Sequence, residues 1–284
     1  MDSSLLTIAA PKGSLNRRIA IFYLHGGGLL YGERDDLPTP YVNMLLSAGY
    51  TIVSADYPLA PESCYSEIIE STLSTFSSTV AQSIRESSLD GYFLFGRSSG
   101  ANLALVLARE IGRNRRLPQP LGIIDFYGYY DLCDNAICSP AKAYQSLPEV
   151  SKETVSSIVE GSECKPTSGP KSKRYALYVY ARQHENAWLE LMGLDRSDQN
   201  HSPEFWSLSD GDIAKLPPLF ITASSGDEDI PLRMSKSLRA KASNVCMKTV
   251  YYLPHDFDRD TSEPTGAKVY KEVLTWMQQV ISQQ

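Results

Sequence analysis

The 284-residue chain lacks a basic excess, a long apolar segment and a signal peptide. Acidic residues outnumber basic ones, 33 to 27, whereas nucleic-acid-binding proteins usually carry a basic excess, so we expect no nucleic-acid partner. No uncharged apolar stretch approaches the roughly 18 residues of a membrane-spanning helix, so we expect no membrane partner. Residues 1–14 have neither the basic start nor the apolar stretch of a signal peptide, so we expect a cytoplasmic protein.

Paired cysteine motifs are also missing. The five cysteines, at positions 64, 133, 138, 164 and 246, form no CxxC pair. Neither a zinc site nor a closed disulfide set is therefore indicated, and reduced thiols are the simplest interpretation.

Apolar residues make up 42% and charged residues 21% of the chain, which is ordinary for a soluble globular protein. Tyrosine is unusually abundant, with 17 residues against 8 phenylalanines and 3 tryptophans.

Short apolar runs alternate with helix-length segments through most of the chain. Continuous apolar runs are typical of strands covered on both faces, and strands that alternate with helices form a mostly parallel sheet. We therefore predict an α/β fold with helices on both faces of the sheet. The expected strands are 18–24, 51–55, 92–95, 121–126, 219–223 and 248–253, and the expected helices are 40–48, 64–86, 99–113, 231–243 and 264–282.

The alternation is interrupted once, over residues 131–217, where no clear strand is found. This segment is too long for a loop in a compact domain, so we interpret it as an inserted lid within a single domain spanning residues 1–284. We expect helices near 151–160 and 174–193, joined by a loop. Aromatic residues are frequent in the segment and either pack inside it or line a pocket: Tyr144, Tyr175, Tyr178, Tyr180, Trp188, Phe205 and Trp206.

A G-x-S-x-G sequence, Gly96 to Gly100, lies between an expected strand and an expected helix. A serine on so sharp a turn sits in strained backbone, and the two glycines let the strand and the helix approach closely. The Ser98 hydroxyl is then exposed at the edge of the sheet. We interpret Ser98 as a nucleophile; the alternative is a serine that only caps the helix.

Three consecutive glycines after His25 follow another expected strand. Glycines let several backbone N–H groups point at one place, where they can stabilise the oxyanion of a tetrahedral intermediate. We predict that the N–H groups of Gly27, Gly28 and Ser99 form this oxyanion hole. A flexible turn or a phosphate loop is the alternative, but the chain has neither GxGxxG nor GxxxxGK[ST].

A serine nucleophile needs a general base, and the chain has four histidines. His255 follows the last expected strand and so falls at the same edge of the sheet as Ser98, which makes it the predicted base. His184 and His201 lie in polar stretches of the lid and are expected to be exposed to solvent. His25 is expected to bond to local backbone.

The base needs a carboxylate that orients it, and the loop after strand 219–223 offers Asp227 and Asp229, with Glu228 less suitable. Either aspartate could serve. The resulting chain order of serine, acid and histidine is that of α/β hydrolases and not of the chymotrypsin or subtilisin types.

Taken together, these motifs resemble the hormone-sensitive-lipase-like esterases of the α/β-hydrolase superfamily. The likeness rests on HGGG at 25–28, DYPLAPE at 56–62 and GRSSGANLA at 96–104, and it extends over residues 18–282. The resemblance implies a Ser-Asp-His carboxylesterase that acts on small esters with short to medium acyl chains, without a cofactor or a metal. Esterases of this type often form dimers, so the resemblance also allows a homodimer.

The chain departs from the family pattern at several positions. Pro58 replaces the arginine of DYRLAPE, and Arg97 and Ser99 replace the aspartate and alanine of GDSAGG. No catalytic group is lost, because Ser99 contributes only its backbone N–H. Asp256 replaces the glycine of HGF, and its charge is expected to raise the pKa of His255. Only 24 residues precede HGGG, fewer than is usual, so we expect the sheet to lack one or more early strands.

The family pattern leaves the acid ambiguous. Counting forward from Pro217-Pro218, which opens the strand, favours Asp227, whereas counting back from the following helix favours Asp229. The strand end positions the acid more directly, so we predict Asp227. Asp229 is then expected to be exposed or to cap the helix that starts near Pro231.

Four tyrosines follow strand ends near the predicted site and are candidates for a substrate pocket, although core packing would explain each equally well: Tyr31, Tyr127, Tyr129 and Tyr130.

Two other functions stay open, namely an amidase (an arylformamidase or a small peptidase) and a hydrolase-like ligand-binding protein without turnover. We favour the esterase, whose partner is a small-molecule ester.

Overall fold

The computed structural model describes residues 5–162, 165–195 and 206–283; Cys164, His201 and Phe205 lie outside these ranges. Within them a seven-stranded sheet has the order β1-β3-β2-β4-β5-β6-β7. β1 pairs antiparallel with β3, and the remaining neighbours pair parallel, which confirms the predicted mostly parallel sheet. The strands are β1 (Leu6–Ala9), β2 (Ile19–Leu24), β3 (Thr51–Ala55), β4 (Gly91–Arg97), β5 (Gly122–Phe126), β6 (Leu219–Ser224) and β7 (Val245–Val250).

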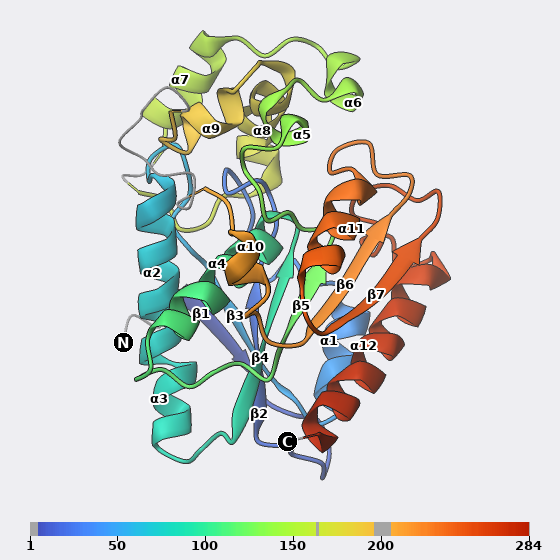
Figure 1. Cartoon of the computed structure of the whole chain (residues 1–284). Helices are drawn as coiled ribbons and strands as arrows, with labels where there is room; N and C mark the ends of the chain where they lie inside the picture. The colour runs from blue at the N-terminus through green and yellow to red at the C-terminus, as the bar shows by residue number, and fades with distance from the viewer. Residues whose placement is uncertain (1–4, 163–164, 196–205, 284) are drawn as a thin grey trace.

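Helices cover both faces of the sheet, as predicted (Figure 1). α1 (Thr39–Ser47) and α12 (Pro264–Ser282) bury apolar side chains against one face. α2 (Tyr65–Ser78), α3 (Val80–Arg85), α4 (Ser99–Arg113) and α11 (Leu232–Lys241) do so against the other. Every residue of β2, β4, β5 and β6 is therefore buried, which explains why these strands read as uninterrupted apolar runs.

A group of helices from residues 131–217 lies beyond the carboxyl ends of the strands, at the top of Figure 1. Its members are α5 (Asn135–Cys138), α6 (Lys142–Gln145), α7 (Lys152–Glu160), α8 (Lys171–Gln183) and α9 (Ala187–Leu191). α8 contacts α6, α7 and α9 and so forms the centre of the group. The short α10 (Asp210–Ile213) lies lower and contacts α11. No helix in the described ranges is long and apolar enough to cross a membrane.

Two expected helices are each divided in the structure. The segment 64–86 forms α2 and α3 because Thr79 adopts φ −118° and ψ −87°, which interrupts the helical path. The segment 174–193 forms α8 and α9, with Asn186 between them in the left-handed region at φ 57°, and α8 already begins at Lys171. Apolar periodicity continues across both breaks, so the sequence pattern did not reveal them.

The two edge strands also differ from expectation. β1 was not predicted, because its four residues are too few to give a clear pattern. β7 spans Val245–Val250 instead of 248–253, since the chain leaves the sheet at Tyr251 and Tyr252. These tyrosines are 65% and 89% exposed, and Tyr252 has a φ of 63°, so their strand-like composition did not reflect pairing.

Asp125 in β5 carries an unusual buried carboxyl group. One of its oxygens accepts a 2.8 Å hydrogen bond from the Gly128 N–H, and the other has no partner among the described residues. Burial raises the pKa of Asp125 to about 7, although the bond from Gly128 opposes the shift. In an unfolded chain the pKa of aspartate is about 4. The folded state therefore holds this proton more tightly, and the resulting stabilisation is lost as the pH rises from about 4 to about 7.

Replacing Asp125 with asparagine should remove this pH dependence while keeping the acceptor for Gly128. The free energy of unfolding of the natural chain should fall between pH 5 and pH 8. This fall should exceed the one for Asp125→Asn by on the order of 3 kcal/mol. Urea unfolding at the two pH values measures the difference. Asp35→Asn, which removes a charge from an exposed position, serves as the control and should follow the natural chain. Parallel pH profiles for the natural chain and Asp125→Asn would contradict the assignment.

Candidate active site

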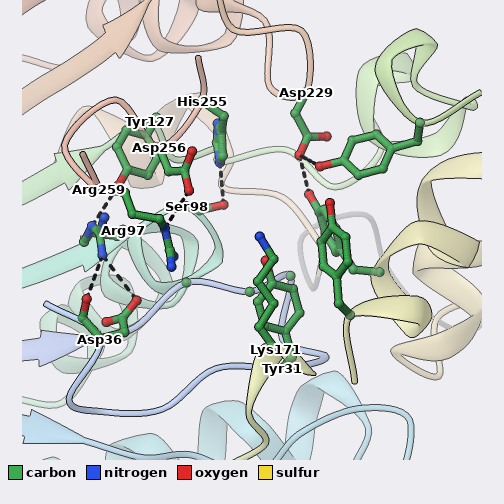
Figure 2. A pocket seen from close by; sticks show the side chains of 16 residues that line it. Tyr31, Asp36, Arg97, Ser98, Tyr127, Lys171, Asp229, His255, Asp256 and Arg259 are labelled. Carbon is green, nitrogen blue, oxygen red and sulfur yellow. Dashed lines mark hydrogen bonds and ion pairs between the residues drawn. The ribbon is translucent and has the colours of Figure 1, made fainter. Parts of the chain in front are cut away.

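The predicted reactive groups meet at the carboxyl edge of the sheet. Ser98 follows β4, Asp227 follows β6 and His255 follows β7. Ser98 Oγ lies 2.8 Å from His255 Nε2, and His255 Nδ1 lies 2.6 Å from Asp227 Oδ2. Figure 2 shows His255 directed at Ser98 across the pocket. The structure therefore brings together the three residues that the sequence analysis placed in one site.

Ser98 occupies the strained turn that its motif predicts. Its φ of 53° and ψ of −120° are rare for a residue with a side chain. A Cβ at Gly96 would lie 2.1 Å from the Gly100 carbonyl oxygen, and one at Gly100 would lie 2.2 Å from that of Leu24. Only glycine at both positions lets α4 start this close to the strands, and this close approach projects Ser98 into the pocket.

The acid loop positions Asp227 through its own backbone. Asp227 Oδ1 accepts hydrogen bonds from the N–H groups of Asp229 (2.9 Å) and Ile230 (2.8 Å), which leaves Oδ2 for His255. A carboxylate oxygen can only accept, so the proton of the imidazole belongs on Nδ1. His255 Nε2 is then an acceptor facing the Ser98 hydroxyl, which is the orientation that a general base requires.

Asp229 does not have the exposed or helix-capping place expected from the sequence. It is 6% exposed, and its carboxylate accepts from Arg182 Nε (2.8 Å) and from the hydroxyls of Tyr144 (2.8 Å) and Tyr178 (2.7 Å). The prediction was wrong because these three partners come from the inserted segment, at least 47 residues away along the chain. Nothing in the local sequence around Asp229 indicates them.

The pKa of His255 is raised above its ordinary value. Burial lowers the pKa, but the charge of Asp227 and its hydrogen bond to the ring raise it by more, and the charges of Asp229 and Asp256 add to the increase. The expected influence of Asp256 is thus confirmed. Arg259 Nε donates to Asp256 at 2.7 Å, so part of that negative charge is neutralised locally.

The glycine loop after β2 borders the same pocket. Gly27 and Gly28 have φ values of 113° and 67°, which a residue with a Cβ rarely adopts. In the described part of the chain, the N–H groups of Gly27, Gly28 and Ser99 donate to no protein acceptor. They are therefore available to an oxygen atom of a ligand. A Cβ at Gly28 would lie 2.3 Å from the Tyr178 ring, and Trp188 Nε1 donates to the Gly28 carbonyl at 2.9 Å.

The pocket is small, with a volume of about 130 Å³. Of the four predicted tyrosines, Tyr31 and Tyr127 line it. Tyr129 and Tyr130 do not line it, so their proposed place in the pocket was wrong. Tyr129 packs edge-on against Trp188, and the Tyr130 hydroxyl forms a hydrogen bond with Ser237. Tyr144, Tyr175 and Tyr178 of the inserted segment, for which the sequence left a pocket or core packing open, also line it, as does Asp229, the alternative acid. The lining residues that were not predicted as part of the site include Asp36, Arg97, Lys171, Asp256 and Arg259.

Arg97, which replaces the family's aspartate, belongs to a buried ionic cluster in the wall of the pocket. Its guanidinium donates to Asp258 Oδ1 (2.7 Å), to the Tyr127 hydroxyl (2.8 Å) and to Asp36 Oδ2 (3.2 Å). Burial lowers the pKa of Arg97, but Tyr127 and Asp258 raise it by more, so the charge is retained. The Tyr127 hydroxyl is thus occupied by the protein, and only its ring faces the pocket.

The remaining histidines lie away from the reacting atoms. As predicted, His25 bonds to local backbone, with Nδ1 2.8 Å from the Gly26 carbonyl oxygen, and it stacks on Tyr57. His184 was expected to be exposed, but it is half-buried, with Nε2 3.2 Å from the Val150 carbonyl oxygen. The described residues contain no cluster of side chains that could hold a metal ion.

The site has a serine on a strained strand-to-helix turn, and an acid and a histidine follow the ends of later strands. This arrangement defines the α/β-hydrolase class of site. The chain belongs to the family described as alpha/beta hydrolase fold, which matches residues 21–259. The α/β-hydrolase fold that the motifs predict is thereby confirmed. A solved alpha/beta hydrolase superfamily protein from Enterococcus faecalis is 31% identical, with a TM-score of 0.80 over 96% of this chain and 94% of that one.

Two curated relatives match part of the chain. An esterase from Acinetobacter venetianus is 30% identical over 112 residues, which is 39% of this chain and 36% of the relative. An acetyl esterase from Salmonella typhi is 29% identical over 147 residues, which is 48% of this chain and 45% of the relative. The chain therefore spans less than half the length of these relatives.

Proposed function

We propose that this protein is a serine carboxylesterase that hydrolyses small esters with short acyl chains. The observation that carries the proposal is the continuous hydrogen-bonded series from Ser98 through His255 to Asp227, of which Ser98 and His255 line a pocket. The names of the curated relatives, an esterase and an acetyl esterase, agree with it.

The proposed mechanism is acyl transfer. Ser98 Oγ attacks the ester carbonyl while His255 Nε2 accepts the hydroxyl proton, and Asp227 holds the imidazole and stabilises its charged form. The N–H groups of Gly27, Gly28 and Ser99 would hold the oxyanion, each contributing on the order of 3 kcal/mol to the transition state. The imidazolium then protonates the leaving alkoxide, and the neutral imidazole activates a water molecule that releases the acid.

We also propose that residues 131–217 act as a lid on this site. Two buried ion pairs join α8 to the rest of the chain. Arg174 donates to both carboxylate oxygens of Glu62, at 2.8 and 2.7 Å, and Arg182 donates to Asp229. Tyr178 and Trp188 rest on the glycine loop. These contacts support the proposal, because they hold α8 at the wall of the pocket, where it would limit the length of the acyl chain.

The pocket volume leads to a test with p-nitrophenyl esters of increasing acyl length. A volume of about 130 Å³ lies below the range of roughly 300–1,000 Å³ that is usual for drug-sized ligands. We therefore expect kcat/KM to be highest for acetate to butyrate and to fall at least about 10-fold by octanoate, since a longer chain must displace packed lid side chains.

A serine-reactive phosphonate should label Ser98, which mass spectrometry of the tryptic peptides would detect. Absence of both ester turnover and labelling would refute the esterase. A maximum at octanoate or beyond would refute the short-chain specificity alone. Faster turnover of aryl-amides or N-formylkynurenine than of esters would favour the amidase.

A further inference from the structure

Six charged side chains line the candidate active-site pocket, and five of them are paired with an opposite charge. Asp36 accepts from Arg97 (3.2 Å), and Asp256 accepts from Arg259 (2.7 Å). Asp229 accepts from Arg182, which lies behind the pocket wall (2.8 Å). The sixth charged group is Lys171. Among the described residues it has no carboxylate within ion-pair distance, and its Nζ lies 4.4 Å from the centre of the Tyr175 ring.

Two opposing contributions act on the charge of Lys171 within its own helix, and the favourable one is the cation–π contact of its ammonium with the Tyr175 ring one turn further along α8. Lys171 is the first residue of α8, where the helix dipole disfavours a positive charge by a few tenths of a kcal/mol or more. The first turn of α8 contains no acidic residue that would compensate. Figure 2 shows the Lys171 amino group directed into the pocket, toward the side where Ser98 and His255 lie.

A second hollow of about 240 Å³ adjoins the pocket. Lys171, Arg259 and Asp36 line both spaces and so stand at their junction, where the charge of Asp36 is paired with that of Arg97 (3.2 Å). Within the described chain only the Nε of Arg259 is bonded, to Asp256, so its two terminal nitrogens can donate to a ligand. Glu33 and Asp35 line only the second hollow, so an anionic group would be favoured at the junction and opposed further out.

We propose that the ester substrate carries a carboxylate, and that Lys171 and Arg259 bind this carboxylate at the junction while Ser98 attacks the ester group. This inference rests on the proposed esterase function. Charge-assisted hydrogen bonds from an ammonium and a guanidinium are the strongest contacts available to a carboxylate here. Lys171 is thus a specificity-determining residue, and it takes no part in the chemical step.

Pairs of esters that differ only in the charge of one end provide the test. Monoethyl glutarate against ethyl pentanoate places the charge on the acyl side, and 4-acetoxybutanoate against butyl acetate places it on the alcohol side. The natural chain should prefer the charged member of one pair, and that pair identifies which part of the substrate reaches the junction. Lys171→Met should lower kcat/KM for the charged ester about 10-fold, mainly through KM, and change the neutral ester less than 2-fold. Lys171→Arg should restore most of the loss.

Lys173→Met is the matched control, because Lys173 lies on the same helix, is exposed and does not line the pocket. It should leave both esters unchanged. No preference for the charged member of either pair, or an equal effect of Lys171→Met on charged and neutral esters, would overturn the inference. Turnover of neutral esters would meanwhile show whether the proposed function itself stands.

Binding can also be measured without turnover. In a Ser98→Ala background, calorimetric titration with monoethyl glutarate and with 4-acetoxybutanoate reports the Kd directly. Adding Lys171→Met should raise the Kd of the preferred compound about 10-fold, and adding Lys173→Met should not. If Lys171→Met and Lys173→Met gave equal Kd values with both compounds, the proposed carboxylate site would be refuted. This outcome does not depend on turnover, so it holds even if the protein hydrolyses no ester.

Discussion

Ser98→Ala should lower kcat for p-nitrophenyl acetate by about 10⁶-fold, to the level that the oxyanion donors and substrate binding can sustain alone. The Ser98 hydroxyl is the group that His255 Nε2 faces at 2.8 Å, and no other hydroxyl bonds to that nitrogen among the described residues. The melting temperature should change little, because removing one hydroxyl from a strained turn leaves the packing intact.

Two further variants make this result specific. Ser243→Ala, an exposed serine between α11 and β7, should retain full activity. Ser98→Ala combined with His255→Ala should be no slower than Ser98→Ala alone, because residues that act as a unit do not lose activity additively. Measurable turnover above about 1% in purified Ser98→Ala would show that another group is the nucleophile.

Asp227→Asn should lower kcat by about 10⁴-fold while the protein stays folded. Asparagine keeps the size of the side chain but can present an N–H to His255 Nδ1, which then no longer carries the proton. His255 Nε2 would become a donor toward Ser98 and could not accept its proton. Stopped-flow or discontinuous assays at several pH values measure kcat, and circular dichroism checks the fold.

Asp229→Asn should have the opposite profile. The variant breaks a buried ion pair with Arg182 and weakens the acceptor for Tyr144 and Tyr178, so the free energy of unfolding should fall by about 3–5 kcal/mol. At a temperature where the variant is folded, kcat should stay within about 10-fold of the natural value, since Asp227 still holds His255. If Asp229→Asn were the severely inactive variant, the assignment of the acid would be reversed.

Much of the fold and of the site could be predicted because the relevant signals are local. Buried parallel strands appear in the sequence as apolar runs. The strand, the sharp turn and the helix around Ser98 all lie within residues 91–113. His255 was identifiable because it follows the last strand of the sheet. The short edge strand β1 and the breaks at Thr79 and Asn186 escaped prediction, since they depend on a few backbone angles and on pairing that leave little pattern.

The pocket could not be predicted to the same degree. Tyr129 and Tyr130 follow a strand end just as Tyr127 does, but their side chains turn into the core and onto α11, respectively. Tyr144, Tyr178 and Lys171 reach the pocket from the inserted segment, whose path over the sheet depends on long-range contacts. Cytoplasmic location and a homodimer stay predictions from the sequence.

The sequence by itself predicted Ser98 as the nucleophile and His255 as the base, and it located the glycine loop and indicated the α/β-hydrolase fold, because each follows from a short motif whose backbone mechanics are the same wherever it occurs. The distance from the strand end already favoured Asp227 over Asp229, but only the tertiary structure shows which group lies across from each of the two aspartates. His255 faces the first, and Arg182 of α8 faces the second. The same holds for two charge pairs at the pocket, Asp36 with Arg97 and Asp229 with Arg182, whose members come from distant parts of the chain, whereas Asp256 and Arg259 are three residues apart.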